Sequence, residues 1–325
     1  MSAESITLPC RHCSAVNRFP VDRALLDLSR VTCGRCKSTL LRVNGEPLTN
    51  VRDEDLCHPF DREALHKLKA IPMMDKVLSK VMGGTLDKLS RFYMLAGAVR
   101  VSDRQAPRLW RLYLEAAGRI NVDPPPLFIT QTPIMNAFAV GAGQPLVAVT
   151  TGLLDGMEDR EILAVLGHEL THVRLGHVLY RTLAQLLVLG GLGLLNKFFG
   201  IAGLLALPLR IALVRWYQMA ELSADRGELI AAGSLKTSVR VHMLLSGGTT
   251  RFMDELDEAA FIDQAHEAET ERDNDLLLWV MELLNNTQRT HPLPAWRVHH
   301  VLRYASSEPF FQVLAGEQTV TIEAR

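Results

Sequence analysis

The spacing of hydrophobic and polar positions changes several times along the chain, and each change predicts a different local structure. Residues 1–45 are polar and rich in turns, with little helical periodicity. Residues 46–60 contain prolines and a run of acidic side chains, a composition typical of a linker. From residue 61 to 82, apolar side chains recur at helical spacing. The pattern therefore predicts a small N-terminal unit, a linker and a larger domain over 61–325.

Short strands among helices are expected in the middle of the chain. An amphipathic helix over about 107–120 ends before Asp-Pro-Pro-Pro, because proline cannot continue the helical hydrogen bonds. Residues 127–130, 137–140 and 146–150 each have the composition of a strand, and glycine and proline form the turn between the last two. A further helix is predicted from about residue 157.

The most apolar part of the chain runs from about residue 183 to 213, interrupted by Asn196, Lys197, Pro208 and Arg210. Each uninterrupted run has roughly 10 to 13 residues, shorter than the about 20 that a membrane-spanning helix needs. Two interpretations stay open. The segment forms buried helices, or it forms a hairpin that dips into a membrane or covers an apolar cleft.

Composition narrows the class of protein. Hydrophobic residues make up 48% of the 325 positions and charged residues 22%, which is typical of a globular chain with a substantial core. The formal net charge is −1, so the protein has no overall positive field that would attract nucleic acid. Nucleic acid is therefore not expected as a partner. The first residues have no basic start followed by an apolar run, so no secretory signal is visible and a cytoplasmic location is expected.

A zinc-binding pattern stands in the helix that follows the predicted strands. Residues 168–172 read His-Glu-Leu-Thr-His. Positions i and i+4 lie on one face of a helix, so the imidazoles of His168 and His172 can converge on one zinc ion. Glu169 lies beside that face and is expected to act as the general base on the zinc-bound water. Burying these three side chains without a metal would be costly, which disfavours the alternative of two unliganded helix histidines.

A catalytic zinc ion needs a third protein ligand and one open position. The metzincin arrangement fails, because the positions that it requires hold Leu175 and Val178. His177 points away from the zinc-binding face, and we interpret it as a packing or outer-sphere histidine. The remaining candidate is Glu221 from a second helix. Asp225, one turn later, is expected to accept the other ring N–H of a zinc histidine.

Several motifs along the chain follow one order and spacing: Asn136-Ala137-Phe138-Ala139, Val149 to Leu154, Ala164 to His172, Glu221-x-x-Ala224-Asp225, and Thr290-His291-Pro292 with Arg297 after it. Together they resemble the HtpX-like zinc metallopeptidases, a gluzincin family, over roughly residues 101–302. The resemblance implies an α+β fold. It consists of a mainly helical gluzincin-type metallopeptidase domain with a small sheet beside the active-site helix.

The resemblance also suggests where a substrate binds. It implies that the strand containing Asn136, Ala137, Phe138 and Ala139 is a sheet edge on which an extended polypeptide is laid, as in β-augmentation. His291 is implied to lie near the cleft as a catalytic residue that polarises the substrate carbonyl or stabilises the oxyanion. A purely structural Thr-His-Pro turn is an equal alternative.

Four of the five cysteines form two CxxC pairs, Cys10 with Cys13 and Cys33 with Cys36. Two such pairs in turn-rich sequence predict a structural zinc ion, and redox-active dithiols are the competing interpretation. The segment also resembles the zinc ribbon at the N-terminus of the longer bacterial thioredoxins. Its arginines are not interleaved with aromatic side chains, so they do not indicate a nucleic-acid site.

These observations lead to one hypothesis and one alternative. The chain is expected to be a cytoplasmic metalloendopeptidase that holds one catalytic and one structural zinc ion and cleaves unfolded or membrane-associated polypeptides. In the family that the chain resembles, the region between the zinc histidines and the glutamate often contains transmembrane or membrane-apposed helices. Segment 183–213 is therefore a candidate for contact with a membrane surface. The alternative is a chaperone or adaptor that uses the cleft for peptide binding without cleavage.

Overall fold

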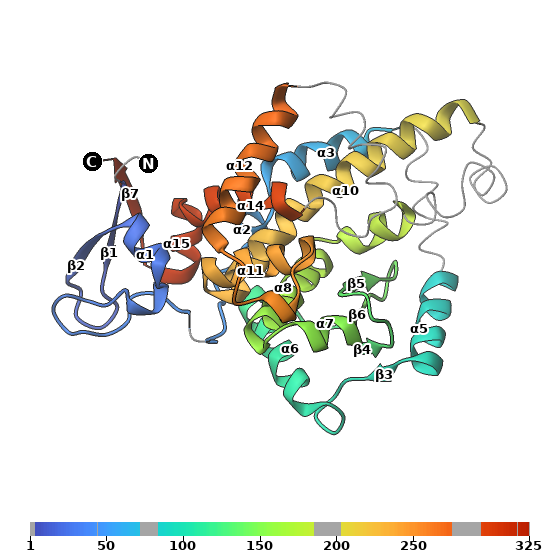
Figure 1. Ribbon diagram of the computed structural model, residues 1–325, viewed down its shortest axis with the longest axis horizontal. Coiled ribbons are helices and arrows are strands. Elements are labelled where there is room, and N and C mark those ends of the chain that lie inside the picture. The colour runs from blue at the N-terminus through green and yellow to red at the C-terminus, as the bar shows by residue number, and fades with distance from the viewer. Residues whose placement is uncertain are drawn as a thin grey trace.

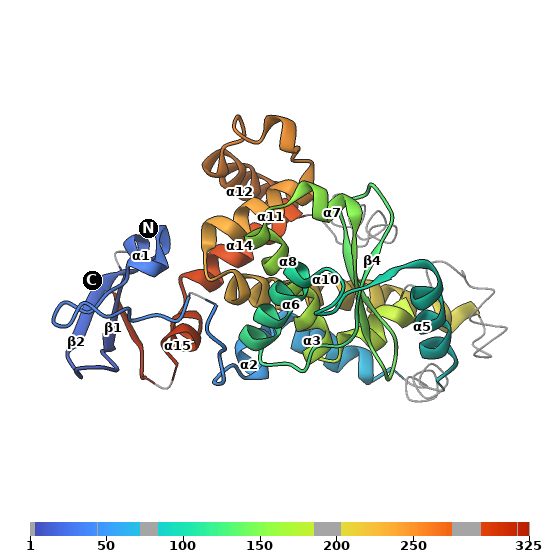
Figure 2. The same ribbon diagram turned by 90° about the horizontal axis from the view of Figure 1, so that it is seen from below.

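Helices form most of the structure, with two small sheets set beside them (Figure 1). This arrangement confirms the predicted α+β class. One sheet lies at the end of the molecule where both termini meet, and the other lies across the helical body from it (Figure 2). The computed structural model describes residues 4–43, 45–71, 84–184, 203–274, 294–316 and 318–324.

The terminal sheet joins the two ends of the chain. Strand β1 (Glu4–Pro9) pairs antiparallel with β2 (Val16–Pro20) on one side and with β7 (Thr321–Ala324) on the other. Helix α1 (Val21–Leu26) and the 3-10 helix η1 (Leu28–Arg30) follow β2. The last strand of the chain thus completes the sheet of the predicted zinc ribbon.

Residues 46–60, predicted to be a linker, contribute buried side chains to the main core. Leu48 and Val51 are buried, and the short helix α2 (Asp53–Leu56) packs Leu56 inward. The backbone of this stretch is also anchored, because the Val51 carbonyl accepts a 2.7 Å hydrogen bond from Arg174. The apolar residues that recur every three to five positions explain why this segment lies against the helices.

Helix α3 (Pro59–Lys69) begins with a buried acid, Asp61, which points toward the helical body. The Asp61 carboxylate accepts hydrogen bonds from Trp216 Nε1 at 3.0 Å and from Ser223 Oγ at 2.6 Å. The predicted helix over 61–82 is thus observed as far as Lys69, and its continuation over residues 72–83 lies outside the described residues.

The second sheet has the strand order β3-β4-β6-β5. Strands β4 (Leu127–Thr130), β5 (Ala137–Val140) and β6 (Leu146–Thr150) lie at the predicted residues, and β3 (Val99–Arg100) adds a short fourth strand. β4 and β6 are parallel, whereas the other two pairs are antiparallel. β5 is an edge strand of this sheet, and α8 (Asp159–Arg174) packs next to it.

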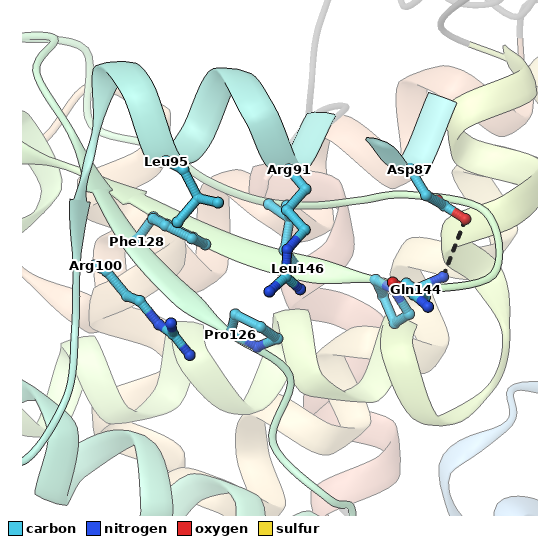
Figure 3. A pocket seen from close by; sticks show the side chains of 9 residues that line it. Asp87, Arg91, Leu95, Arg100, Pro126, Phe128, Gln144 and Leu146 are labelled. Atoms are coloured by element: carbon cyan, nitrogen blue, oxygen red, sulfur yellow. Dashed lines mark hydrogen bonds between the residues drawn. The ribbon is translucent and has the colours of Figure 1, made fainter. Parts of the chain in front are cut away.

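Helix α5 (Thr85–Gly97) covers the outer face of this sheet and holds the turn before β6 in place. Asp87 accepts backbone N–H groups of Gly143 at 2.9 Å and of Gln144 at 3.3 Å. Figure 3 shows Asp87 pointing toward Gln144, while Leu95 of the same helix lies over Phe128. Because this turn connects β5 to β6, the contact fixes the edge strand from outside.

The central helix is α8, which carries residues 168–172 and contacts α6, α10, α11 and β5. Two glycines let α8 approach α10 closely. A Cβ atom on Gly167 would lie 2.2 Å from the Ala231 Cβ, and one on Gly227 would lie 1.7 Å from Thr171 Oγ1. The other helical elements of the described residues are α6 (Pro107–Ile120), α7 (Thr151–Gly156), α10 (Gly203–Ala232), α11 (Leu235–Ser246), η3 (Thr250–Phe252), α12 (Glu258–Asn274), α14 (Pro294–Ala305) and α15 (Glu308–Ala315).

Among the described residues, every helix is too short or too polar to cross a membrane. Most of the apolar segment predicted at 183–213 falls at 185–202, outside the described residues. The choice between buried helices and a membrane-contacting hairpin therefore stays a prediction.

Candidate active site

Two helices bring His168, His172 and Glu221 to one point. The Nε2 atoms of the two histidines on α8 lie 3.2 Å apart. The carboxylate oxygens of Glu221, on α10, lie 3.4 Å from His168 Nε2 and 3.3 Å from His172 Nε2. All three residues are buried, with exposed fractions of 4% or less. The close approach at Gly167 and Gly227 makes this convergence possible.

The spacing of these three donor atoms fits a tetrahedral zinc ion. Nitrogen and oxygen ligands lie about 2.0–2.1 Å from zinc, which puts two ligand atoms of a tetrahedron about 3.3–3.4 Å apart. The observed separations of 3.2, 3.3 and 3.4 Å match this value. Two imidazole nitrogens and a carboxylate are also a common donor set of catalytic zinc sites, which leave the fourth position for water.

An acid and an arginine lie directly behind His168. Asp225 Oδ1 is 3.2 Å from His168 Nδ1, so it accepts the ring N–H on the side away from the metal position. Arg297 of α14 donates from Nε to Asp225 Oδ2 at 2.7 Å, and its Nη1 lies 3.1 Å from Glu221 Oε2. Burial raises the pKa of Asp225, but the Arg297 charge and hydrogen bonds hold that pKa well below its ordinary value.

His172 has a similar support on its other side. Its Nδ1 lies 3.1 Å from Nδ1 of His177, and His177 Nε2 lies 3.0 Å from Asp61 Oδ2. A row of His172, His177 and Asp61 thus connects the metal position to helix α3. Such outer partners fix the orientation of a ligand imidazole. Burial, together with the nearby Arg181 charge, lowers the pKa of His172 well below its ordinary value and favours the neutral ring that binds metals.

The two histidines differ in their affinity for protons. Burial lowers the pKa of His168, but hydrogen bonds to Asp225 and Glu221 outweigh it and raise that pKa to about 9. A metal ion that binds here therefore displaces a proton from His168, as metal binding to histidine generally does.

Glu169 lies in the same helix turn and is fully buried. Arg181 Nη1 is 3.2 Å from its Oε2, and Arg181 also donates to the Tyr217 hydroxyl at 3.4 Å. The Arg181 side chain is only 1% exposed, so the cation and the carboxylate share a water-poor environment. The arginine thus offers a fixed opposite charge to Glu169.

A pocket opens between the edge strand and the metal position. Asn136, which directly precedes β5, and Ala137, its first residue, line this pocket together with His168 and Glu169. Glu228 and Arg297 line it as well. Of the other predicted substrate-binding residues, Ala139 is buried and Phe138 is half-buried. His291 lies outside the described residues.

Several buried groups at this centre were not singled out from the sequence. Arg181, Asp61 and the pair of Glu228 and His242 contact the predicted residues or line the pocket. Burial, with the Asp225 charge, raises the pKa of Glu228 to about 7, and burial lowers the pKa of His242 to about 3. Arg181 and Glu228 carry one sequence signal, because each is a charged residue in a largely apolar stretch.

The four N-terminal cysteines also come together. Cys10 Sγ lies 3.5 Å from Cys36 Sγ, and Cys13 Sγ lies 3.6 Å from Cys33 Sγ. All four sulfur atoms lie within 4.8 Å of one another. Zinc–sulfur bonds of about 2.3 Å put tetrahedral thiolates about 3.8 Å apart, close to these values. A hydrogen bond from the Ser38 hydroxyl lowers the pKa of Cys10 to about 5, whereas burial and contacts with the other three thiols raise the pKa of Cys13 to about 11.

A histidine pair one helical turn apart, a glutamate from a second helix and a neighbouring sheet edge define a metallopeptidase of the gluzincin type. Comparison with known proteins agrees. The sequence profile of peptidase family M48 matches residues 103–305, and the chain belongs to this family. The predicted resemblance to the HtpX-like metallopeptidases is thereby confirmed.

Relatives cover different shares of the chain. The chain is 31% identical over 263 residues to the plastoglobule-localized metallopeptidase 48, chloroplastic, of Arabidopsis thaliana, which is 80% of this chain and 75% of the relative. A protease HtpX homolog of Moorella thermoacetica is 32% identical over 48% of this chain and 60% of its own length. The corresponding protein of Ralstonia nicotianae is 33% identical over 42% and 54%. No solved structure matches the chain.

Proposed function

We propose that this M48 peptidase is a zinc-dependent endopeptidase that hydrolyses peptide bonds in unfolded or membrane-associated polypeptides. One observation carries the proposal. The ligand atoms of His168, His172 and Glu221 lie 3.2 to 3.4 Å from one another, at the spacing of a tetrahedral zinc site. We assign these residues as zinc ligands and Glu169 as the general base.

The proposed chemistry follows from the side chains around that position. When bound, zinc polarises the scissile carbonyl and lowers the pKa of a bound water toward neutrality. Glu169 accepts a proton from the attacking water and later donates a proton to the amine leaving group. Arg181 holds the Glu169 carboxylate in place, while Asp225 and His177 orient the two imidazoles. Burial of all these groups excludes bulk water from the proton transfer.

An extended polypeptide is the substrate that best suits the edge strand. β5 ends the sheet, and its first residue, Ala137, lines the pocket that also contains His168 and Glu169. Backbone pairing with an edge strand requires an extended segment, which folded proteins rarely present. We therefore propose that unfolded chains bind along Asn136–Ala139. Contact with a membrane surface through segment 183–213, at a cytoplasmic location, is proposed from the apolar sequence of that segment.

Casein is a convenient test substrate because it is largely unfolded. The purified chain is expected to cleave casein at internal sites, to stop when a chelator removes zinc, and to recover when zinc is added back. Fragment sizes on a gel and mass spectrometry of the products measure this. Casein that binds but stays intact, with zinc present in the protein, would instead favour a chaperone or adaptor.

We propose a structural zinc ion at Cys10, Cys13, Cys33 and Cys36, supported by the mutual spacing of the four thiols. Metal analysis should find two zinc ions per chain. Replacing Cys10 and Cys33 with serine should remove one, because two thiolates cannot complete a tetrahedral site. His168→Ala should remove the other.

The fifth cysteine provides the control for this experiment. Cys57 is half-buried and lies outside the four-thiol group, so Cys57→Ser should retain both zinc ions. An unchanged zinc content in the Cys10 and Cys33 double variant would contradict the structural site. The casein-cleaving activity of the double variant shows whether the peptidase needs the ribbon. Full activity would mean that the ribbon is dispensable for cleavage, and loss of activity would mean that it is required.

A further inference from the structure

A second group of metal-ligating side chains lies on helices α12 and α14 and includes none of the proposed catalytic residues. His266 and Glu269 are three positions apart on α12, and His299 is on the adjacent helix α14. His299 Nδ1 lies 3.3 Å from His266 Nδ1 and 2.6 Å from Glu269 Oε2. One ligand atom of each residue lies within 4.8 Å of the other two.

We propose that His266, Glu269 and His299 bind an exchangeable divalent transition-metal ion, with zinc as the best match. The 3.3 Å between the two Nδ1 atoms equals the spacing of two nitrogen ligands on a tetrahedral ion. The imidazole donors select zinc, nickel or copper over magnesium and calcium, which prefer oxygen ligands. Water completes the coordination, because His266 is exposed and the other two side chains are 20% to 23% exposed.

The contact between His299 and Glu269 has a simpler explanation, a hydrogen-bonded ion pair on the surface. That explanation accounts for the 2.6 Å distance but not for His266, whose Nδ1 faces the same nitrogen of His299. A single proton on His299 Nδ1 can be donated in line to Glu269 or to His266 Nδ1 but not to both, whereas a cation can bind all three ligand atoms together. Metal binding would displace the proton between His299 and Glu269 and needs only a small rotation of the carboxylate.

The position of this group suggests what an ion there would do. It would link α12 to α14, which pack against each other. Two residues before His299, α14 carries Arg297, whose guanidinium contacts Asp225 and Glu221 at the catalytic centre. An ion bound to the group would therefore stabilise the helix that supports the proposed zinc ligands, while sharing none of their side chains.

Titration of the zinc-loaded protein tests the proposal. The full chain, dialysed so that only tightly held zinc remains, is titrated with zinc in competition with a chromophoric chelator, and the thermal midpoint is followed in parallel. One further equivalent should bind and raise the midpoint. Loss of a residue that only hydrogen-bonds to a metal ligand typically weakens metal binding about 10–100-fold. His266→Ala and His299→Ala each remove a ligand itself, so each should weaken zinc binding by about 100-fold or more. Glu269→Gln should weaken it too, since it keeps the shape of the side chain but removes the charge.

His300 supplies the matched control. It follows His299 directly but packs edge-to-face against Trp296 and His58, at ring-centroid distances of 4.8 and 5.3 Å, and is not a member of the group. His300→Ala should retain the additional equivalent. The proposal is overturned if no further equivalent binds at millimolar zinc, or if it binds equally well to His266→Ala and His299→Ala. Both readouts measure binding and stability alone, so they stand whether or not the chain cleaves casein.

Discussion

Replacing Glu169 with glutamine is expected to abolish peptide hydrolysis while leaving zinc bound. Glutamine has nearly the same shape but cannot accept the proton of the attacking water. General base catalysis typically accelerates a reaction about 10²–10⁴-fold, so kcat should fall by about 10²-fold or more. Zinc content should remain at the parent value, because the proposed ligands are other residues. The measurement is casein or peptide hydrolysis by chain preparations of equal zinc content.

Glu169→Gln also breaks the ion pair with Arg181, which is expected to lower stability. The control variant must therefore break a buried ion pair at a position outside the proposed chemistry. Glu161 lies on the same helix, is buried and accepts a 2.9 Å hydrogen bond from Arg240. Glu161→Gln should therefore lower stability by a comparable amount but keep hydrolysis. A Glu169→Gln variant that hydrolyses casein at the parent rate would contradict the proposed role of Glu169 as general base. Equal inactivation of the two variants would trace the loss to folding.

Two kinds of sequence signal predicted parts of the site. One is local spacing, and the other is the order of motifs along the chain, which pointed to Glu221 and Asp225. The four-residue spacing of His168 and His172 determines their common face on any helix, so the pair needed no tertiary information. The observed bounds of β4, β5 and β6 also agree with the predicted strands, because short apolar runs bounded by glycine and proline identify strands well.

Contacts between distant segments could not be predicted in this way. Asp61 lies 116 positions before its partner His177, and only the packing of α3 brings them together. Arg181 lies nine positions after His172, and the sequence around it does not indicate that its side chain points toward Glu169. β7 pairs with β1 across the whole length of the chain, and its four residues contain no signal that names a partner strand.

Residues 46–60, predicted to be a linker, show what composition can and cannot indicate. Prolines and acidic residues indicate irregular backbone, and the structure over 46–60 is indeed mostly irregular. Irregular backbone is nevertheless able to bury side chains, as Leu48 and Val51 do against the helices. Composition therefore carries information about the kind of backbone but not about its burial.

Replacing Arg297 with methionine is expected to destabilise the fold by about 3–5 kcal/mol and to reduce the zinc content of the catalytic site. Arg297 is fully buried and contacts both Asp225 and Glu221. Methionine fills similar space but leaves two buried carboxylates without their cation. Since whole domains are stable by only about 5–15 kcal/mol, much of the protein should unfold under mild denaturant. Denaturant unfolding and zinc analysis measure the two effects.

A double variant distinguishes the loss of this charge from a general packing defect. Adding Asp225→Asn to Arg297→Met removes one of the two stranded charges, so the double variant should be more stable than the sum of the single losses predicts. Arg303→Met is the matched control, because Arg303 lies on the same helix but is exposed. It should change the free energy of unfolding by less than about 0.5 kcal/mol. Strict additivity of the two buried substitutions would mean that the ion pair of Arg297 and Asp225 does not hold the centre together.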